Sequence, residues 1–313
     1  MRILVTGGAG FIGKSLCRRL LKEGHEVCSL DIVESTIKHR NFTSLIGDIT
    51  NPKYIDPDYG GLELWRDVDF CFHLAAMANV DEVREHRDKA FRVNLYGTFN
   101  IIEACRKMNI PLAYISTACV YGHTKQHPST EDGPTLPVDW YGVTKRAGEE
   151  LVKGLLNRYV ILRFGTTLGA EMRPALCTHI FLKVAINKEA FPIRGTGKQT
   201  RNWIYIDDLV DGCVKAMEHC TSGCHLCEKD TFNLVGQPSY SVKDLAHICQ
   251  QIVNKRVAIT IDKLPARPDD VMREDISIKK AQDLLGWSPK VKLQEALVRI
   301  YKEWMKDGRK GKR

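Results

Sequence analysis

Residues 6–13 read TGGAGFIG and follow the short apolar run MRILV at residues 1–5. The glycines fit both G-x-G-x-x-G and G-x-x-G-x-x-G, and they are Gly7, Gly8, Gly10 and Gly13. Between a strand and a helix, such glycines permit a tight turn, close approach of a pyrophosphate and close packing of the helix on the strand. The helix N-terminus adds unpaired N–H groups and a partial positive charge. The stretch therefore predicts a dinucleotide-binding loop.

The first half of the chain alternates short apolar runs with amphipathic stretches. Strands are expected at residues 1–6, 25–31, 42–48, 68–76, 112–117 and 159–165. Helices are expected at residues 11–24, 90–108 and 141–156. This rhythm is typical of a parallel sheet with helices on both faces, and unbroken apolar strands fit a sheet that is buried on both sides. The sequence thus predicts an α/β fold with a doubly wound parallel sheet.

The alternation breaks after residue 165, where prolines and glycines become more frequent. We expect a smaller, mixed α/β lobe over the carboxyl edge of the sheet, and we expect a helix at 207–218 and a strand at 231–235 to return to the main sheet. The predicted division has three parts: a nucleotide-binding domain at 1–165 with 200–235, a substrate-binding lobe at 166–199 with 236–304, and a basic tail at 305–313.

The composition is that of an ordinary globular chain. Of 313 residues, 43% are hydrophobic and 27% charged, and the net charge of +8 weakly favours acidic partners such as nucleotides. No apolar run approaches the length of a membrane span, and the first strand starts at Arg2, so we expect no signal peptide and no membrane association. Eleven cysteines, mostly inside expected elements, favour reduced thiols and a cytoplasmic location.

Two carboxylates follow the second and third expected strands. Asp31 comes eighteen residues after Gly13, where a carboxylate can bind the adenosine ribose hydroxyls and repel a 2′-phosphate. Asp48 ends the third strand and could reach the adenine. The pair predicts NAD rather than NADP as the cofactor, although a plain turn residue is the alternative for Asp31.

WYGVTK at residues 140–145 places Tyr141 and Lys145 on the same face of a helix. An ammonium group near a phenol stabilises the phenolate and makes it a usable base near neutral pH. Ser116 and Thr117 end the fifth strand, at the edge where such sheets bind ligands, so a hydroxyl there can share a substrate oxygen with Tyr141. Without these nearby hydroxyl groups, the tyrosine and lysine would indicate only a solvated helix face.

With these residues in place, the chain resembles the extended short-chain dehydrogenase/reductase family, in its nucleotide-sugar epimerase/dehydratase branch, of which UDP-glucose 4-epimerases are typical. The resemblance runs from Met1 to about Trp304. It is carried by TGGAGFIG, HLAA (73–76), ISTACVYG (115–122), YGVTK (141–145), LRFG (162–165), GTGKQTRNWIYIDDL (195–209) and LLGWSPK (284–290).

The resemblance implies a catalytic triad of Thr117, Tyr141 and Lys145, in which Tyr141 takes a proton from a sugar hydroxyl while hydride passes to NAD. It implies a further set of cofactor contacts: Gly7, Gly10, Phe11, Ile12, Gly13, Asp31, Asp48, Ile49, Leu74, Ala75, Ala76, Asn94, Tyr141 and Lys145. It implies substrate contacts at Ser116, Thr117, Thr166, Arg201 and Arg267. Guanidinium groups suit a substrate diphosphate, because their forked donors bind two phosphate oxygens at once.

Two departures from the family pattern bear on the reaction. Dehydratases of this family typically carry Asp-Glu directly after the catalytic Ser/Thr, whereas this chain has Ala118 and Cys119. Ala118 has no proton to exchange, while Cys119 could act as an auxiliary acid or base if its pKa were lowered. Thr166 stands where many sugar epimerases have asparagine, which leaves the sugar and the nucleotide base open.

The leading expectation is an NAD-dependent 4-epimerase acting on a nucleotide-diphosphate sugar. A dehydratase, decarboxylase or 4-keto reductase of the same family is the nearer alternative. A non-catalytic NAD-binding protein or an RNA-interacting protein is the alternative from another class, although a pure binder has no need of a polarised phenol and no RNA-binding motif is visible. The resemblance further implies a homodimer through helices near 90–108 and 142–156.

A cysteine-rich stretch, HCTSGCHLCEKD at 219–230, falls outside this scheme. Cys220, Cys224 and Cys227, with two histidines nearby, could supply tetrahedral zinc ligands. A partner knuckle is missing, so reduced thiols without a metal are the favoured interpretation. A disulfide between Cys224 and Cys227 is a third alternative.

Overall fold

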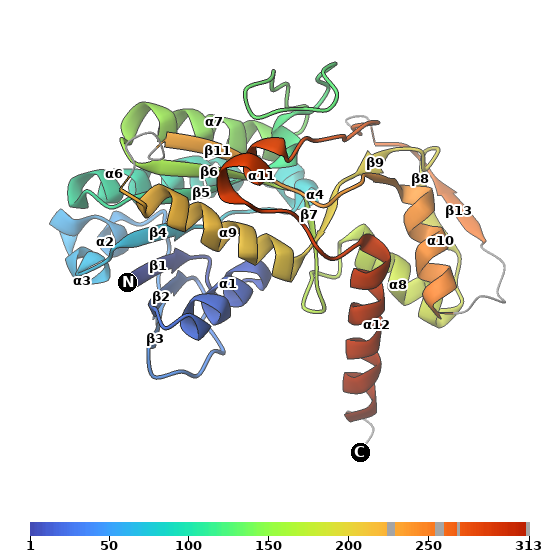
Figure 1. Cartoon of the computed structure of the whole chain (residues 1–313), viewed down its shortest axis with the longest axis horizontal. Coiled ribbons are helices and arrows are strands. Elements are labelled where there is room, and N and C mark those ends of the chain that lie inside the picture. Colours follow the sequence, from blue (N-terminus) through green and yellow to red (C-terminus); the bar gives the residue numbers. More distant parts are fainter. Residues whose placement is uncertain (224–228, 254–259, 268–269, 311–313) are drawn as a thin grey trace.

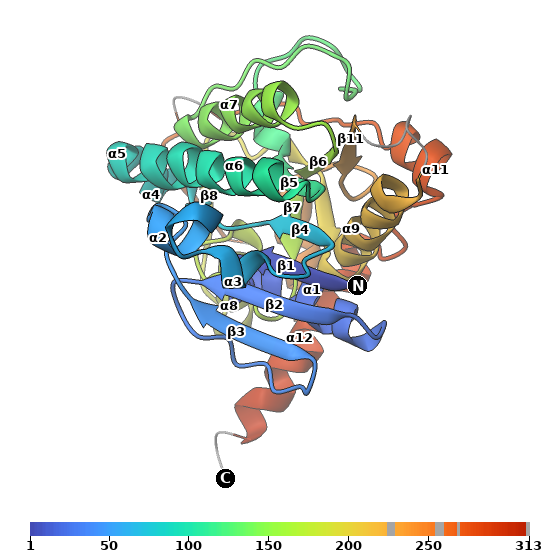
Figure 2. The ribbon, with the colours of Figure 1, turned by 90° about the vertical axis from the view of Figure 1, so that its left-hand side faces the viewer.

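The computed structural model of the chain describes residues 1–223, 229–253, 260–267 and 270–310. Seven strands form one sheet in the order β11-β6-β5-β4-β1-β2-β3 (Figures 1 and 2). The strands are β1 Arg2–Thr6, β2 Glu26–Asp31, β3 Phe42–Ile46, β4 Phe70–His73, β5 Leu112–Thr117, β6 Tyr159–Phe164 and β11 Lys229–Leu234. Every neighbouring pair is parallel, which confirms the expected sheet. The order reverses between β1 and β4, and such a reversal opens a ligand crevice at the carboxyl ends of the strands.

Helices cover both faces of this sheet (Figure 2). The apolar sides of α1 (Phe11–Lys22), α9 (Ile206–Thr221) and α11 (Lys279–Leu285) bury one face, and those of α6 (Thr98–Met108) and α7 (Trp140–Leu155) bury the other. Short helical turns extend the second layer before β4, namely α2 (Pro52–Ile55), η1 (Pro57–Tyr59) and α3 (Leu62–Trp65). The hydrophobic clusters on the two faces of the sheet together enclose the strands that carry the site.

The smaller lobe lies beside the carboxyl edge of the sheet, on the right of Figure 1. Its core forms where α8 (Cys177–Asn187), α10 (Val242–Val253) and α12 (Leu293–Lys310) pack around β8 (Phe191–Arg194). Short strand pairs complete it: β8 with β13 (Ile261–Leu264), β9 (Thr200–Arg201) with β12 (Tyr240–Ser241), and β7 (Thr166–Leu168) with β10 (Trp203–Tyr205). The lobe lies over the carboxyl ends of the strands, so the crevice has the sheet on one side and the lobe on the other.

Three sequence expectations differ from the structure in detail. The helix expected at 90–108 is divided into α5 (Arg87–Phe91), a π-helical turn η2 (Arg92–Gly97) and α6, and it follows a short helix α4 (Val80–Glu85). The returning segment starts with α9, because β9 pairs with β12 and β10 pairs with β7, both in the small lobe. The tail expected from residue 305 is helical as far as Lys310, since α12 continues through it.

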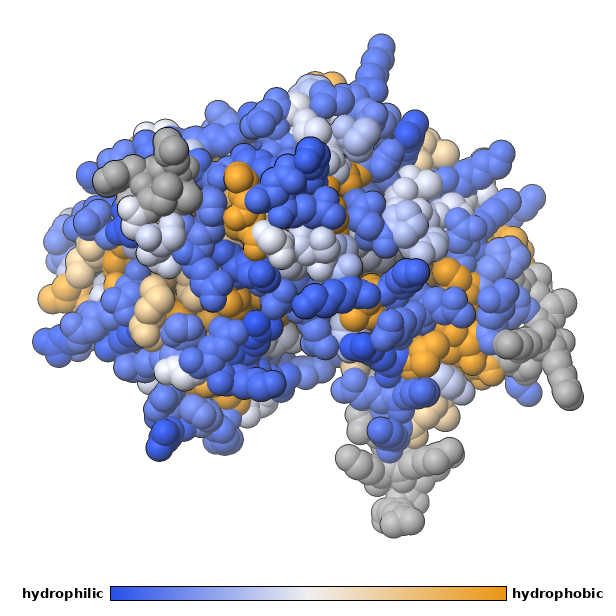
Figure 3. Space-filling model, viewed as in Figure 1, coloured by the Kyte–Doolittle hydropathy of each residue, from blue (hydrophilic) through white to orange (hydrophobic). Residues whose placement is uncertain are grey.

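The surface seen in Figure 3 is mainly hydrophilic, with small hydrophobic patches, one of which lies over the small lobe. In the part of the chain that the structure describes, no helix has both the length and the apolar character needed to cross a bilayer.

Candidate active site

A cavity of about 660 Å³ lies where the strand ends meet the small lobe. Its wall is formed by the glycine loop after β1, the ends of β5 and β6, the first turn of α7, the start of α8 and the segment 270–276. Doubly wound sheets bind their ligands at this position, and the volume is in the usual range for small-molecule sites. The cavity is therefore the candidate active site.

The glycine loop leaves no room for a side chain at Gly7 or Gly13. Gly7 has φ of 72°, in the left-handed region, and a Cβ there would lie 2.7 Å from the backbone nitrogen of Ala75. A Cβ on Gly13 would collide with the carbonyl oxygen of Gly7. Helix α1 begins after Gly10 with no side chain capping its first N–H groups. A bare backbone cradle at a helix N-terminus fits the pyrophosphate of a dinucleotide. The predicted loop residues that line the cavity are Gly7, Gly10, Phe11, Ile12 and Gly13.

The predicted adenosine contacts lie beyond the cavity wall. The Asp31 carboxylate, at the end of β2, accepts hydrogen bonds from the backbone N–H groups of Ala9 at 3.0 Å and Val33 at 3.3 Å. Asp48 is exposed and accepts from the N–H of Thr50 at 2.8 Å. Of the remaining predicted contacts, Leu74 and Ala76 line the cavity, whereas Ile49 and Ala75 do not. The ribose and adenine roles of Asp31 and Asp48 stay predictions.

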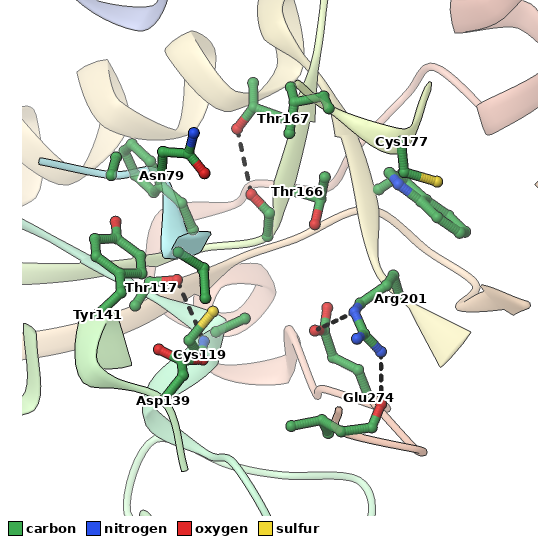
Figure 4. Close-up of a pocket in the computed structure, with 18 of the residues that line it drawn as sticks. Asn79, Thr117, Cys119, Asp139, Tyr141, Thr166, Thr167, Cys177, Arg201 and Glu274 are labelled. Atoms are coloured by element: carbon green, nitrogen blue, oxygen red, sulfur yellow. Dashed lines mark hydrogen bonds and ion pairs between the residues drawn. The ribbon is translucent and has the colours of Figure 1, made fainter. Parts of the chain in front are cut away.

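The structure brings the three predicted catalytic side chains together at the cavity wall. Thr117 is the last residue of β5 and Tyr141 lies in the first turn of α7, and the two side chains are neighbours in Figure 4. Lys145 lies one turn further along α7 and is buried, with its Nζ 4.5 Å from the centroid of the Tyr114 ring. A hydroxyl, a phenol and an ammonium group thus converge from one strand and one helix.

Burial dominates the protonation of these groups. It raises the pKa of Tyr141, while the Arg173 guanidinium and the Thr117 hydroxyl act to lower it. Burial lowers the pKa of Lys145 to about 7, against the opposing effect of the Glu149 carboxylate. Arg173 is therefore a cation that acts on the phenol, and the sequence did not predict it.

Asn94 lies outside the cavity wall, and its predicted cofactor contact stays a prediction. It is fully buried in the π-helical turn η2. Its side chain accepts from the N–H of Met77 at 2.8 Å and donates to the Met77 carbonyl at 3.0 Å and to Thr144 Oγ1 at 3.1 Å. Thr144 in turn donates to the Tyr141 carbonyl at 2.8 Å. Asn94 therefore ties the loop after β4 to the first turn of α7.

Ser116 lines the cavity, and its hydroxyl is bonded within the protein. Its hydroxyl donates to Glu149 Oε1 at 2.6 Å, and the residue is 1% exposed. The hydroxyl proton of Ser116 is thus used by Glu149, while its oxygen can still accept a hydrogen bond, so the substrate contact at Ser116 stays a prediction.

Arg201 lines the cavity opposite Thr117 and Tyr141, as Figure 4 shows, and protein groups already hold its guanidinium. Its Nη1 donates to the carbonyls of Thr200 and Val271, both at 2.7 Å. Its Nη2 pairs with Asp270 at 2.6 Å, and Nε lies 3.9 Å from Glu274. The predicted diphosphate contact would require some of these bonds to be exchanged.

Arg267 and Thr166 also line the cavity, and their substrate contacts stay predictions. Arg267 Nη2 pairs with Asp81 of α4 at 2.6 Å, across the opening between the two parts of the molecule. Asp81 also binds Arg84 at 3.2 Å. Both partners of the Arg267–Asp81 pair are more than a third exposed, so the pair is solvent-screened and can be exchanged for a ligand.

Cys119 contributes a neutral thiol to the cavity. Burial raises its pKa to about 12, and the Asp139 carboxylate acts in the same direction. The hypothesis of an auxiliary acid or base needs a lowered pKa, so the electrostatics of the site oppose it.

The cysteine-rich stretch is only partly covered by the structure. Cys220 is buried in α9, while Cys224 and Cys227 lie outside the described residues. Among the residues described, no group of three or more His, Cys, Asp or Glu side chains is placed to hold a metal ion.

Sequence reasoning missed several polar residues of the cavity: Asn79, Asp81, Asp139, Arg173 and Glu274. Asp139 could have been found, because an aspartate before a helical pattern is an N-cap signal, and it accepts from the N–H of Gly142 at 2.7 Å. Arg173 and Glu274 lie in irregular segments, so no periodicity marked them.

Comparisons with known proteins agree with this geometry. The model of the NAD dependent epimerase/dehydratase family matches residues 3–234. The chain is 31% identical to UDP-glucuronic acid decarboxylase 1 of Danio rerio, over 95% of this chain and 71% of that protein. It is also 31% identical to a putative UDP-glucose 4-epimerase of Methanocaldococcus jannaschii, over 97% and 98% of the two chains. The crystal structure of UDP-glucuronic acid 4-epimerase from Bacillus cereus, in complex with UDP-glucuronic acid and NAD, is similar with a TM-score of 0.86 at 30% identity, covering 96% and 98%.

Proposed function

Since the chain belongs to the NAD-dependent epimerase/dehydratase family and its cofactor is NAD, we propose that it is a nucleotide-diphosphate-sugar 4-epimerase. Its relatives named above are UDP-sugar epimerases and decarboxylases, so a nucleotide-sugar enzyme is the coarser conclusion. The epimerase is the finer one, and the chemistry of the cavity supports it.

Tyr141 and Thr117 would bind the same sugar hydroxyl, at C4. NAD, when bound, supplies an acceptor that takes hydride from that carbon and gives it back. As the hydride leaves, Tyr141 takes the hydroxyl proton, and it returns the proton when hydride comes back to the opposite face of the turned 4-keto sugar. The pKa of Tyr141 is raised by burial, so cations near the phenol are needed for this base, and Arg173 and Lys145 lie on the same wall.

The observation that supports the epimerase is that neither residue directly after Thr117 can act as an acid or a base near neutral pH. Expulsion of water across C5 and C6 needs a further acid and a further base. At the two positions where the family's dehydratases have carboxylates, this chain has Ala118 and Cys119. The Cys119 thiol, with its pKa raised to about 12, stays neutral at the pH of a cell. Transient oxidation and return of hydride need neither group.

A decarboxylase is a second candidate, and Arg173 favours it together with the uronic acid names among the relatives. Arg173 is a cation in the cavity wall and acts on Tyr141, so it is positioned near the reacting end of a sugar. A guanidinium there suits a carboxylate at C5. Once C4 is a ketone, such a carboxylate is β to the carbonyl, and the bond to it is weakened. The same site could therefore release carbon dioxide from a uronic acid.

A panel of UDP-, GDP-, CDP- and dTDP-sugars with NAD, including UDP-glucose and UDP-glucuronic acid, tests these candidates. Mass spectrometry and proton NMR would follow the products. Unchanged mass with inverted C4 is the expected result. Loss of carbon dioxide would establish the decarboxylase, and loss of water would contradict the epimerase. Net NADH formed in proportion to the sugar would indicate a reaction that stops at oxidation. No conversion by a protein that binds NAD would favour the non-catalytic alternative.

A further inference from the structure

Glu149 is a buried carboxylate that the proposed proton chemistry does not use. It lies on α7 one turn beyond Lys145 and two turns beyond Tyr141, so the three side chains share one face of the helix. Its side chain is 0% exposed. An ionised carboxylate at such a place is expensive unless it is paired and fully hydrogen-bonded.

The bonds of Glu149 join α7 to the two strands beneath the site. Arg163 of β6 donates to it from Nε at 2.9 Å and from Nη2 at 2.8 Å, a two-pronged geometry that is the strongest available to this pair. Ser116 of β5 donates to Oε1 at 2.6 Å. The carboxylate therefore fixes the residue directly before Thr117 to the helix that carries Tyr141.

Arg163 extends the connection to the segment after β5. It is 2% exposed, and its Nη1 donates to Tyr121 Oη at 3.0 Å and to the Glu131 carbonyl at 3.1 Å. The Tyr121 hydroxyl donates in turn to Asn233 Oδ1 of β11 at 2.7 Å. All three guanidinium nitrogens of Arg163 thus donate hydrogen bonds. They help to hold the chain before Thr117, at Ser116, and after it, at Tyr121.

The titratable groups around Lys145 and Tyr141 are His73 of β4, Tyr114 of β5, Cys119 of η3 (Ala118–Val120), Glu149 of α7 and Arg163 of β6, with Asp139 and Arg173 from the segments before α7 and before α8. Burial lowers the pKa of His73 to about 3 and raises the pKa of Tyr114 and of Cys119, so these three are neutral at pH 7. Two of these groups are carboxylates: Asp139 acts on Tyr141, and Glu149 acts on Lys145. Glu149 raises the pKa of Lys145, against burial, which brings that pKa down to about 7.

We propose that the Glu149–Arg163 pair is a positioning unit of the active site, which aligns Thr117 with Tyr141 through Ser116, and that the Glu149 carboxylate also favours the ammonium form of Lys145. The first part rests on the proposed function, because it concerns the two hydroxyls that bind the sugar. The second part concerns the cofactor, since the ammonium group of Lys145 is expected to hold the nicotinamide ribose. The two parts can be measured separately.

Cofactor binding tests the charge balance without any sugar. NADH affinity would be measured by fluorescence titration from about pH 5 to about pH 9, a range that spans the midpoint expected for Lys145 and a midpoint about one pH unit lower. A protonated Lys145 donates best, so affinity falls as pH rises through its pKa. In Glu149→Gln the loss is expected about one pH unit lower, because the anion that favours the charged ammonium is gone. An unchanged midpoint in a folded variant would overturn this part.

Ser116→Ala is the matched control, because it removes the link to β5 and keeps the charge on Glu149. Its NADH midpoint should equal that of the unaltered protein. Its kcat for the sugar found in the panel should fall about tenfold with KM nearly unchanged, since only the alignment is disturbed. A normal kcat would overturn the alignment part. If no sugar is converted by the unaltered protein, the proposed function fails, while the NADH titration still decides the role of the pair.

Glu149→Gln leaves the Arg163 guanidinium buried beside an uncharged amide that has only one acceptor oxygen, so the variant could unfold. The double variant Glu149→Leu with Arg163→Leu removes both buried charges, and such replacements are often neutral for stability. It is expected to lower the NADH midpoint less than Glu149→Gln does, because no unpaired Arg163 cation remains, and to lower kcat as Ser116→Ala does. A folded double variant with the original midpoint and the original kcat would refute the proposal.

Discussion

Tyr141 presents the only phenol among the three converging catalytic groups, and its surroundings favour the neutral form. Burial raises its pKa, and Arg173 and Thr117 offset that effect in part. The neutral phenol of Tyr141 becomes a base only when the ligands and cations of the complete site stabilise the phenolate. The residue is therefore the most direct place to separate chemistry from binding.

Tyr141→Phe removes the hydroxyl and keeps the ring, so it should leave the packing of α7 intact. We expect turnover to fall about 10²- to 10⁴-fold, the usual contribution of a positioned acid or base. NAD affinity should stay within about twofold, because the ring and Lys145 remain. Single-turnover assays beside NADH titrations would measure both. Equal losses of turnover and NAD affinity in a folded variant would contradict the role of Tyr141 as the base.

Cys119 gives the complementary test, because its thiol should be inert. Its pKa is raised to about 12, so it neither gives nor takes a proton between pH 5 and pH 10 in the folded protein. Cys119→Ala is expected to change kcat by less than about threefold and to leave the pH profile unaltered, since the mutation removes only packing. A fall of kcat comparable with that of Tyr141→Phe would instead point to an elimination in which the sulfur takes part.

At the scale of elements, α4 and the segment before residue 268 face each other across the cavity opening through Asp81 and Arg267. A diphosphate and the Asp81 carboxylate would compete for the same guanidinium. Asp81→Asn is therefore expected to strengthen UDP binding about threefold to tenfold, in keeping with the modest strength of an exposed pair. Calorimetric titration with UDP at two salt concentrations would show it.

Glu85→Gln is the control for this experiment, because it makes the same charge change on an exposed part of α4 and lies outside the cavity wall. If both variants strengthen UDP binding equally, the effect is general electrostatics and not release of Arg267. Weaker binding by Asp81→Asn would show that Asp81 positions α4 or contacts the ligand itself.

The elements that carry the triad were predictable, because their signals are local. An apolar run ending in Ser116 and Thr117 marks a buried strand, and the spacing of Tyr141 and Lys145 marks a helix. The π-helical turn at 92–97 was not predictable, since one wider turn leaves the apolar pattern of the segment almost unchanged. Similarly, the partner of Ser116 is 33 residues away and that of Arg267 is 186 residues away. Such choices are made by tertiary packing, which spacing does not encode.

At the scale of the whole molecule, α7 has two faces with different tasks. The inner face carries Tyr141, Lys145 and Glu149. The outer face carries Trp140 and Val143, which are 39% and 38% exposed. Three further exposed aromatic residues lie on the neighbouring helical segment, namely Phe91, Tyr96 and Phe99. We propose that these residues, as a patch over α5 to α7, are covered by the same patch of a second copy of the chain.

A closed twofold contact buries the same surface on both partners, so one charge introduced in the patch acts twice. Sedimentation equilibrium at micromolar concentration should give twice the chain mass of 35.5 kDa. Phe99→Asp is expected to weaken the dimer at least about 100-fold, because each copy would bury an unpaired carboxylate. Leu284→Asp is the control, since Leu284 is 52% exposed on α11, away from the patch, and should leave the dimer intact. A monomeric unaltered chain, or equal effects of the two variants, would refute the interface.

If the dimer forms, the outer face of α7 is held by a partner while Glu149 and Arg163 hold its inner face. The Phe99→Asp monomer should then lose turnover, while the Leu284→Asp protein keeps it.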